Sequence, residues 1–133
     1  MTGHARGTFE IQFVHGPEEK IEGVSLGRRS ADKQYSGDIE GSAKGEMLAA
    51  LTNVKTSAGY VAFERVIGTL QGRKGTFLLQ HAATMTATMR DLSVTVVPDS
   101  GTGQLVGLSG KMMIHIVDGK HSYEFDYTLP ESH

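Results

Sequence analysis

The sequence predicts an all-β protein, an antiparallel barrel of about eight strands, with a β-sandwich as the alternative. Val, Ile, Leu, Phe and Tyr recur at every second position over much of the chain, which is typical of strands with one buried face. The 17 glycines and 3 prolines fit a chain that turns often. Two turn signals, at Gly72 and at Asp118-Gly119, each separate two such alternating segments, as in β-hairpins.

Length and composition exclude several classes of protein. The 133 residues are expected to form one domain, 1–133, and the net charge of −2 predicts neither a nucleic-acid partner nor a membrane partner. The absence of cysteine excludes disulfides, thiolate metal sites and cysteine nucleophiles. The N-terminus lacks the apolar core of a signal peptide, and no apolar run approaches membrane-spanning length, so we expect a cytoplasmic protein.

The first half of the chain predicts three strands. Residues Gly3–Val14 alternate well, with Ala5, Gly7, Phe9, Ile11 and Phe13 on one face, and the polar stretch 15–20 is expected to end that strand. Residues 26–35 predict the second strand. Residues 41–52 contain helix-favouring Ala, Leu, Met and Glu, but we predict a strand there because the neighbouring strands need a partner. A polar loop follows at 52–59.

A long central hairpin, Tyr60–Thr84, follows this loop. Residues 92–97 predict a short strand that Pro98 ends, because proline cannot donate a hydrogen bond to a neighbouring strand. After a glycine-rich turn at 99–103, residues 104–108 predict another short strand.

The last hairpin carries the clearest turn signal, because Asp118-Gly119 is a favoured type I′ pair. This turn places Met112, Ile114 and Ile116 opposite Phe125, Tyr123 and His121 on an apolar face. The opposite face is mostly polar, as expected where one side of a sheet is buried. Ser132 and His133 are expected to extend into solvent.

The central hairpin contains the candidate catalytic pair, Glu64 and His81. If Gly72-Arg73 is the two-residue turn, Glu64 lies directly opposite His81, and Val66 lies opposite Leu79. A carboxylate and an imidazole among apolar neighbours could supply acid–base chemistry, one as general base and the other orienting it. Two alternatives stay open: a cross-strand ion pair that only stabilises the hairpin, or a three-residue turn that puts His81 opposite Arg65.

Other polar side chains are candidate ligand-binding groups. Arg65 and Gln80 lie on the other face of the same hairpin and could bind a carboxylate or carbonyl, since the sequence does not say which face is internal. Tyr35, Tyr60, Tyr123 and Tyr127 could offer hydroxyls to a pocket, or could belong to the core. The six histidines lack the close spacing of a metal site, so we expect no metal and no cofactor.

The segment 97–110, VPDSGTGQLVGLSG, is similar to the Gly-Ser/Thr-Gly signature of allene oxide cyclase and dirigent-type barrels. Over nearly its full length, the chain also resembles a family of small bacterial proteins of unknown function that is assigned to this fold. The matching segments are 3–10, 35–41, Glu64-Arg65 with 68–70, 75–77 with Gln80-His81, and 121–123 with Asp126-Tyr127. The resemblance implies a barrel with a lumen, often in an oligomer, and implies no particular activity.

Three hypotheses of function remain. The first is a small-molecule-binding barrel whose lumen holds an apolar or amphipathic metabolite. The second is a cofactor-free isomerase or cyclase that uses Glu64 and His81. The third is a structural subunit of a homo-oligomer, whose outer apolar strand faces are buried between copies.

Overall fold

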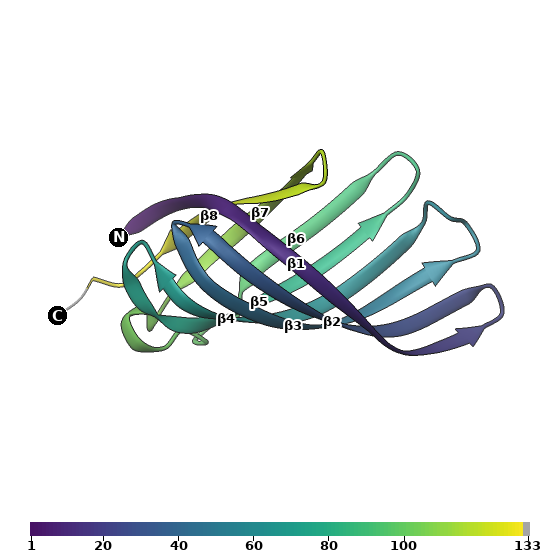
Figure 1. Ribbon diagram of the computed structural model, residues 1–133, viewed down its shortest axis with the longest axis horizontal. Helices are drawn as coiled ribbons and strands as arrows, with labels where there is room; N and C mark the ends of the chain where they lie inside the picture. Colours follow the sequence, from purple (N-terminus) through teal and green to yellow (C-terminus); the bar gives the residue numbers. More distant parts are fainter. Residues whose placement is uncertain (132–133) are drawn as a thin grey trace.

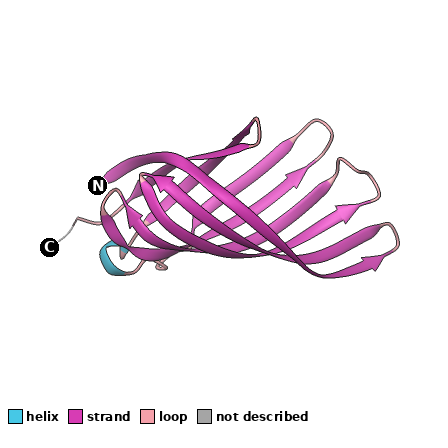
Figure 2. Cartoon of the chain, in the orientation of Figure 1, coloured by secondary structure: helices cyan, strands magenta, loops and turns pink. Residues whose placement is uncertain are grey.

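The computed structural model describes residues 1–131 and confirms the predicted barrel: eight antiparallel strands follow one another in chain order and close on themselves. Figure 1 shows the strands wrapping around a tilted axis, and Figure 2 shows that nearly all of the chain is strand. The strands are β1 (Thr2–Ile21), β2 (Val24–Gly37), β3 (Ile39–Thr52), β4 (Ala58–Leu70), β5 (Arg73–Met85), β6 (Arg90–Val96), β7 (Ser109–Val117) and β8 (Lys120–Thr128). No helix among these described residues is long and apolar enough to cross a membrane.

The two ends of the barrel differ. At one end lie Met1, the end of β8 and the connections at residues 38, 71–72 and 97–108, and we call this the closed end (Figure 1). The opposite end carries the connections at 22–23, 53–57, 86–89 and 118–119, where four hairpins extend outward, and we call it the open end. The hydrophobic core fills the closed end and the middle of the barrel; its largest fully buried side chains include Tyr35, Phe77, Leu105, Tyr123 and Phe125.

Glycines on β1 make room for two tyrosine rings of β8. A Cβ atom at Gly3 would lie 2.4 Å from the ring of Tyr127, and one at Gly7 would lie 2.5 Å from the hydroxyl of Tyr123. The predicted alternation of β1 therefore holds, with Gly3, Gly7 and their odd-numbered neighbours turned inward. The small residues are needed because β8 places large aromatic rings directly beside them.

The first strand is longer than predicted. The expected polar turn at residues 15–20 is wrong, because β1 continues to Ile21 and pairs with β2 from Gly7 to Ile21, with an irregularity between His15 and Glu18. Gly16 and Pro17 lie at this β-bulge, where a residue without an N–H group is tolerated. The outer half of β1 extends beyond the closed barrel, so its polar side chains meet solvent on both faces.

The strand predicted at 104–108 is also wrong. Gly103–Leu105 forms a single turn of 3-10 helix, and positive φ angles at Gly103 (61°) and Gly107 (83°) prevent an extended conformation. The loop instead folds over the closed end, where Leu105 and Leu108 are buried. Thr102 fastens it to β5, because its hydroxyl accepts a hydrogen bond from the N–H of Thr76 at 3.0 Å.

The central hairpin turns one residue earlier than predicted. Leu70 pairs with Arg73, and Gln71 and Gly72 form the loop with φ angles of 45° and 84°, as in a type I′ turn. His81 therefore lies opposite Ala62 instead of Glu64, and Glu64 lies opposite Leu79. The error shifts one arm by two residues, which leaves every side chain on its predicted face because strand side chains alternate with a period of two.

The last hairpin has the predicted register. Val117 pairs with Lys120 around the Asp118-Gly119 turn, and both turn residues have positive φ angles. The other pairs that were expected on the apolar face are Met112 with Phe125, Ile114 with Tyr123 and Ile116 with His121, and all three are observed. The expectation for Ser132 and His133 lies outside the described residues.

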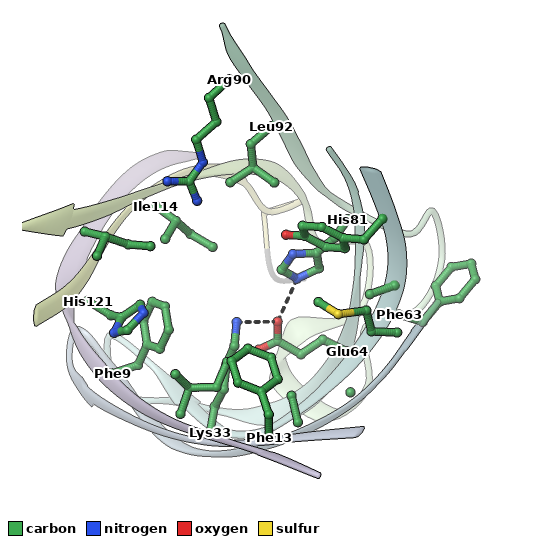
Figure 3. Close-up of a pocket in the computed structure, with 17 residues that line it drawn as sticks. Phe9, Phe13, Lys33, Phe63, Glu64, His81, Arg90, Leu92, Ile114 and His121 are labelled. Carbon is green, nitrogen blue, oxygen red and sulfur yellow. Dashed lines mark hydrogen bonds and ion pairs between the residues drawn. The ribbon is translucent and has the colours of Figure 1, made fainter. Parts of the chain in front are cut away.

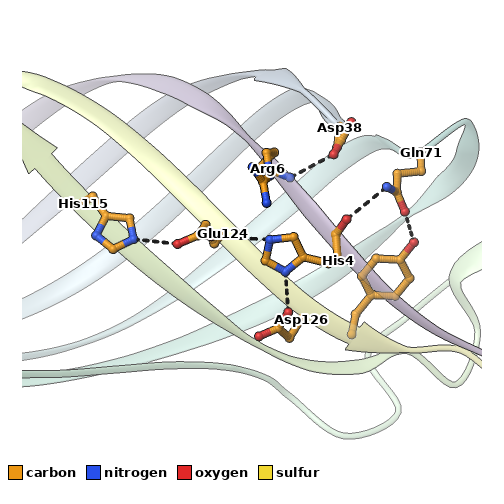
Figure 4. Close-up of polar contacts among 8 residues, drawn as sticks. His4, Arg6, Asp38, Gln71, His115, Glu124 and Asp126 are labelled. Atoms are coloured by element: carbon orange, nitrogen blue, oxygen red, sulfur yellow. Dashed lines mark hydrogen bonds and ion pairs between the residues drawn. The ribbon is translucent and has the colours of Figure 1, made fainter.

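The two seams that complete the barrel are unequal. β1 and β8 pair over eight positions, and on the outer surface His4 lies 2.5 Å from Asp126 and 3.4 Å from Glu124, which also contacts His115 (Figure 4). In contrast, β6 and β7 pair at a single position, Thr95 with Lys111. Toward the open end no backbone pair joins these two strands, and we call this unpaired stretch of the wall the split.

Candidate functional site

A cavity of about 170 Å³ occupies the open end of the barrel (Figure 3). It lies inside the split between β6 and β7, with Leu92 on one side of the split and Ile114 on the other. Most of its lining is apolar or aromatic, from Phe9, Ile11, Phe13, Met47, Tyr60, Leu92, Ile114 and Ile116. Five side chains bring charge or imidazole groups to it: Lys33, Glu64, His81, Arg90 and His121.

Glu64 is the centre of a buried hydrogen-bond network. Its Oε1 atom lies 3.0 Å from the Lys33 ammonium and 2.8 Å from His81 Nε2, as the dashed lines of Figure 3 mark, and its Oε2 accepts a hydrogen bond from Tyr35. Glu64, His81 and Lys33 are only 2%, 5% and 8% exposed. The network therefore joins β2, β4 and β5 through groups that water scarcely reaches.

Register explains how this network forms. His81 lies opposite Ala62, two residues from Glu64, so the acid and the imidazole are diagonal neighbours on one face of the β4–β5 pair. On the other side, β3 separates β4 from β2, and its small Ala43 and Gly45 lie between Glu64 and Lys33. The long lysine side chain can therefore reach across the inner surface to the carboxylate.

The environment sets the ionisation of this network. Burial by itself raises the pKa of Glu64, but the His81 hydrogen bond, the Lys33 charge and the Tyr35 hydroxyl outweigh it and lower the pKa to about 2. Burial, and then the neighbouring Glu64 charge, raise the pKa of Tyr35 well above its usual value. Glu64 is consequently an anion and Tyr35 a neutral donor at physiological pH.

This geometry separates the roles of the acid and the imidazole. A carboxylate with a pKa of about 2 and three donors on its oxygens is a poor general base at neutral pH. An ionised carboxylate only accepts hydrogen bonds, so the His81 Nε2 atom carries a proton. Nδ1 of His81 makes no hydrogen bond. Every fully buried side-chain nitrogen or oxygen of the described residues has a hydrogen-bond partner, so Nδ1 is not fully buried and borders open space. The adjoining space is the cavity.

The other sequence-predicted candidates are dispersed. Arg65 and Gln80 are exposed on the outer face of the barrel, as their alternation with Glu64 and His81 requires, so neither can hold a ligand in this cavity. The Tyr123 hydroxyl accepts a hydrogen bond from the Ile39 N–H at 2.8 Å, and Tyr127 donates to Gln71 near the closed end. Tyr35 contacts Glu64 and does not line the cavity.

Sequence reasoning missed Lys33 and Arg90. Lys33 is two residues before Tyr35 and thus shares its inward face. A lysine in a weakly alternating strand is, however, normally predicted to be solvent-exposed. Arg90 precedes Leu92 by two residues, so extending the predicted strand 92–97 by two residues would have placed Arg90 on the same face as Leu92. Nothing in the sequence showed that β6 and β7 separate here. The described residues contain no group of three or more His, Cys, Asp or Glu side chains arranged to hold a metal.

The chain matches the family model described as "Protein of unknown function (DUF3224)" over residues 5–127. The chain belongs to the DUF3224 family. A DUF3224 protein of unknown function from Shewanella oneidensis MR-1, known from its crystal structure, is 43% identical and superposes with a TM-score of 0.92. The alignment covers 98% of this chain and 100% of that one. No curated protein matches the chain.

The depressed pKa of Glu64 predicts how stability depends on pH. Because the pKa in the folded state, about 2, lies below the usual value of 4.5, the stabilising contribution is complete above pH 4.5 and disappears as the pH falls toward 2. A shift of this size corresponds to about 3 kcal/mol. We expect urea unfolding followed by circular dichroism to show this loss in the native chain, and a flatter profile in Glu64→Gln.

Two variants control this experiment. Glu46→Gln changes an exposed glutamate on the outer face of β3 and should keep the native profile. Lys33→Met combined with Glu64→Gln should recover part of the stability that Glu64→Gln loses at neutral pH, because neither charge then remains buried alone. Identical pH profiles for the native chain and Glu64→Gln would contradict the low pKa.

Proposed function

We propose that this DUF3224 protein binds a small apolar or amphipathic molecule in the cavity at the open end of its barrel. The supporting observation is an apolar cavity of about 170 Å³ beside a split in the barrel wall. Apolar cavities of about 150 Å³ can bind benzene. The enclosed part of the ligand is therefore about the size of one six-membered ring, and any larger part extends through the split.

The polar network supports an amphipathic ligand over a pure hydrocarbon. Lys33 and Glu64 neutralise each other, which lowers the cost of placing an apolar ring beside them. The His81 Nδ1 atom remains available for one hydrogen bond with the ligand. A few polar groups that fix orientation within an apolar wall are typical of small-molecule sites.

Filling the cavity tests this proposal. Ile114 points into the cavity from β7 (Figure 3), so Ile114→Phe should weaken binding of toluene or ethylbenzene at least about tenfold by occupying the same space. Ile67→Phe is the matched control, because Ile67 is 51% exposed on the outside of β4. Binding would be measured by NMR titration of the isotope-labelled protein. Failure of every such probe to shift resonances of cavity residues in the native chain would contradict the proposal.

The second proposal is a cofactor-free isomerase or cyclase, favoured by the free Nδ1 atom of His81. Glu64 accepts a hydrogen bond from Nε2, so in the neutral imidazole the proton lies on Nε2 and Nδ1, which borders open space, is the basic atom that a general base requires. In this scheme His81 removes a proton next to a ligand carbonyl. Lys33, whose ammonium lies 3.0 Å from the shared carboxylate oxygen, stabilises negative charge that develops nearby.

Hydrogen–deuterium exchange tests this second proposal without knowledge of the substrate. The native protein in deuterated water should accelerate exchange of the α-protons of phenylacetone, followed by proton NMR. His81→Gln should abolish the acceleration, and Glu64→Gln should reduce it about tenfold or more, because the imidazole loses its orienting partner. His115→Gln, at an exposed histidine on the outer surface, should have no effect. Exchange that is unaffected by His81→Gln would contradict a base at this position.

A homo-oligomer is a third proposal, compatible with either of the others. Leu48, Val61 and Phe63 are neighbours on the outer face of β3 and β4, and they are 39%, 56% and 55% exposed. Exposed apolar clusters of this kind commonly mark interfaces. Light scattering should give at least twice the mass of one chain, and Phe63→Lys should reduce that mass. A native chain that stays monomeric at high concentration would contradict this proposal.

A further inference from the structure

Arg90 is the one charged side chain at the cavity whose charge is not neutralised by a salt bridge to another described residue. It lies at the start of β6, next to the 86–89 connection at the open end. Figure 3 shows its guanidinium reaching inward over the cavity from the rim, on the same side as Leu92. Asp91, the next residue, is exposed and alternates to the outer face, where it cannot pair with the inward guanidinium.

The remaining charges at the cavity do not offset Arg90. Lys33 and Glu64 form an ion pair, so the cavity side chains carry one net positive charge even with both histidines neutral. Tyr60 also lines the cavity; burial raises the pKa of its phenol, and the nearby Arg90 charge reduces that rise. Tyr60 therefore places a neutral hydroxyl, a hydrogen-bond donor, in the field of the guanidinium.

The order of side chains along the wall defines a polarity for the ligand. Going inward along β6 from the rim, Arg90 is followed by the apolar Leu92 and then by Val94, which pairs with His81. Val94 is four positions beyond Arg90, which is about 13 Å along a strand. A charged group at the rim, an apolar side chain below it and a polar contact near His81 thus follow one another along the wall.

From this arrangement we infer that the ligand is a small amphipathic carboxylic acid, whose carboxylate is held at the rim by Arg90 while its apolar body enters the cavity. Arginine suits this role because its planar guanidinium can donate two parallel hydrogen bonds to one carboxylate. The inference rests on the proposed ligand-binding function and adds the chemical class of the ligand and the residue that selects it.

A matched pair of probes tests the inference. 3-Phenylpropionate and its neutral amide, 3-phenylpropionamide, share one ring and one short chain and differ in the charge of the end group. By NMR titration near neutral pH, the acid should bind the native chain about tenfold more tightly than the amide, the effect of one charged hydrogen-bonded contact. That preference should shrink between about 0.02 M and about 0.5 M salt, because the rim is open to solvent and its charge is screened.

Arg90→Gln should remove the preference by lowering acid affinity about tenfold, while amide affinity stays the same and shows that the cavity is intact. Arg65→Gln is the matched control, an exposed arginine on the outer face, and should keep the preference. An amide that binds as well as the acid, or a preference that survives Arg90→Gln, would overturn the inference and leave the proposed binding function standing. If neither probe binds the native chain, both the binding function and the inference fail.

Discussion

The buried carboxylate of Glu64 is the interaction on which the interior of this barrel depends. It accepts hydrogen bonds from Lys33, His81 and Tyr35, and so connects β2 and β5 to β4 across the inner surface. An ion buried to this extent is tolerated only when its partners replace the hydration it has lost. Together these three partners outweigh the effect of burial and hold the pKa of Glu64 near 2.

This network also marks the boundary between two regions of the barrel. Toward the closed end the interior is solid, with stacked rings such as Phe77 and Phe125, whose centroids are 6.0 Å apart, beneath the plug formed by Leu105 and Leu108. Toward the open end the strands extend past the closed wall, and the interior becomes a cavity. The Glu64 network thus borders the hydrophobic core on one side and the cavity on the other.

The split between β6 and β7 has a similar double effect. The Thr95–Lys111 pair is the single backbone pair at this seam, whereas β1 and β8 pair over eight positions at the other. The separation of the two strands beyond that pair opens a route into the lumen and leaves Arg90 at its rim. A fully paired seam would improve the hydrogen bonding of both strand edges and would close that route.

Local patterns in the sequence were sufficient for the fold and for part of the site. Three features depend only on neighbouring residues: the alternation of β1, the Asp118-Gly119 turn, and which residues of the central hairpin share a face. Glu64 and His81 share a face even though the predicted turn was one residue late, because the resulting shift of two residues preserves the alternation of side chains. The polar outer half of β1 was not predicted as a strand, because a strand that extends beyond the barrel need not alternate. Part of the loop at 97–108 was predicted as a strand, because a short buried apolar segment resembles one in sequence.

By itself, the sequence determined which side chains share a face, because a period of two is a property of a single extended chain. The tertiary structure decided which face is internal, and with it the exclusion of Arg65 and Gln80 from the cavity. It also brought Lys33 to Glu64 across an intervening strand and left Arg90 at the rim with no ion-pair partner among residues 1–131. These contacts depend on how a closed barrel curves and where its seam opens, which are properties of all eight strands together and of no single segment.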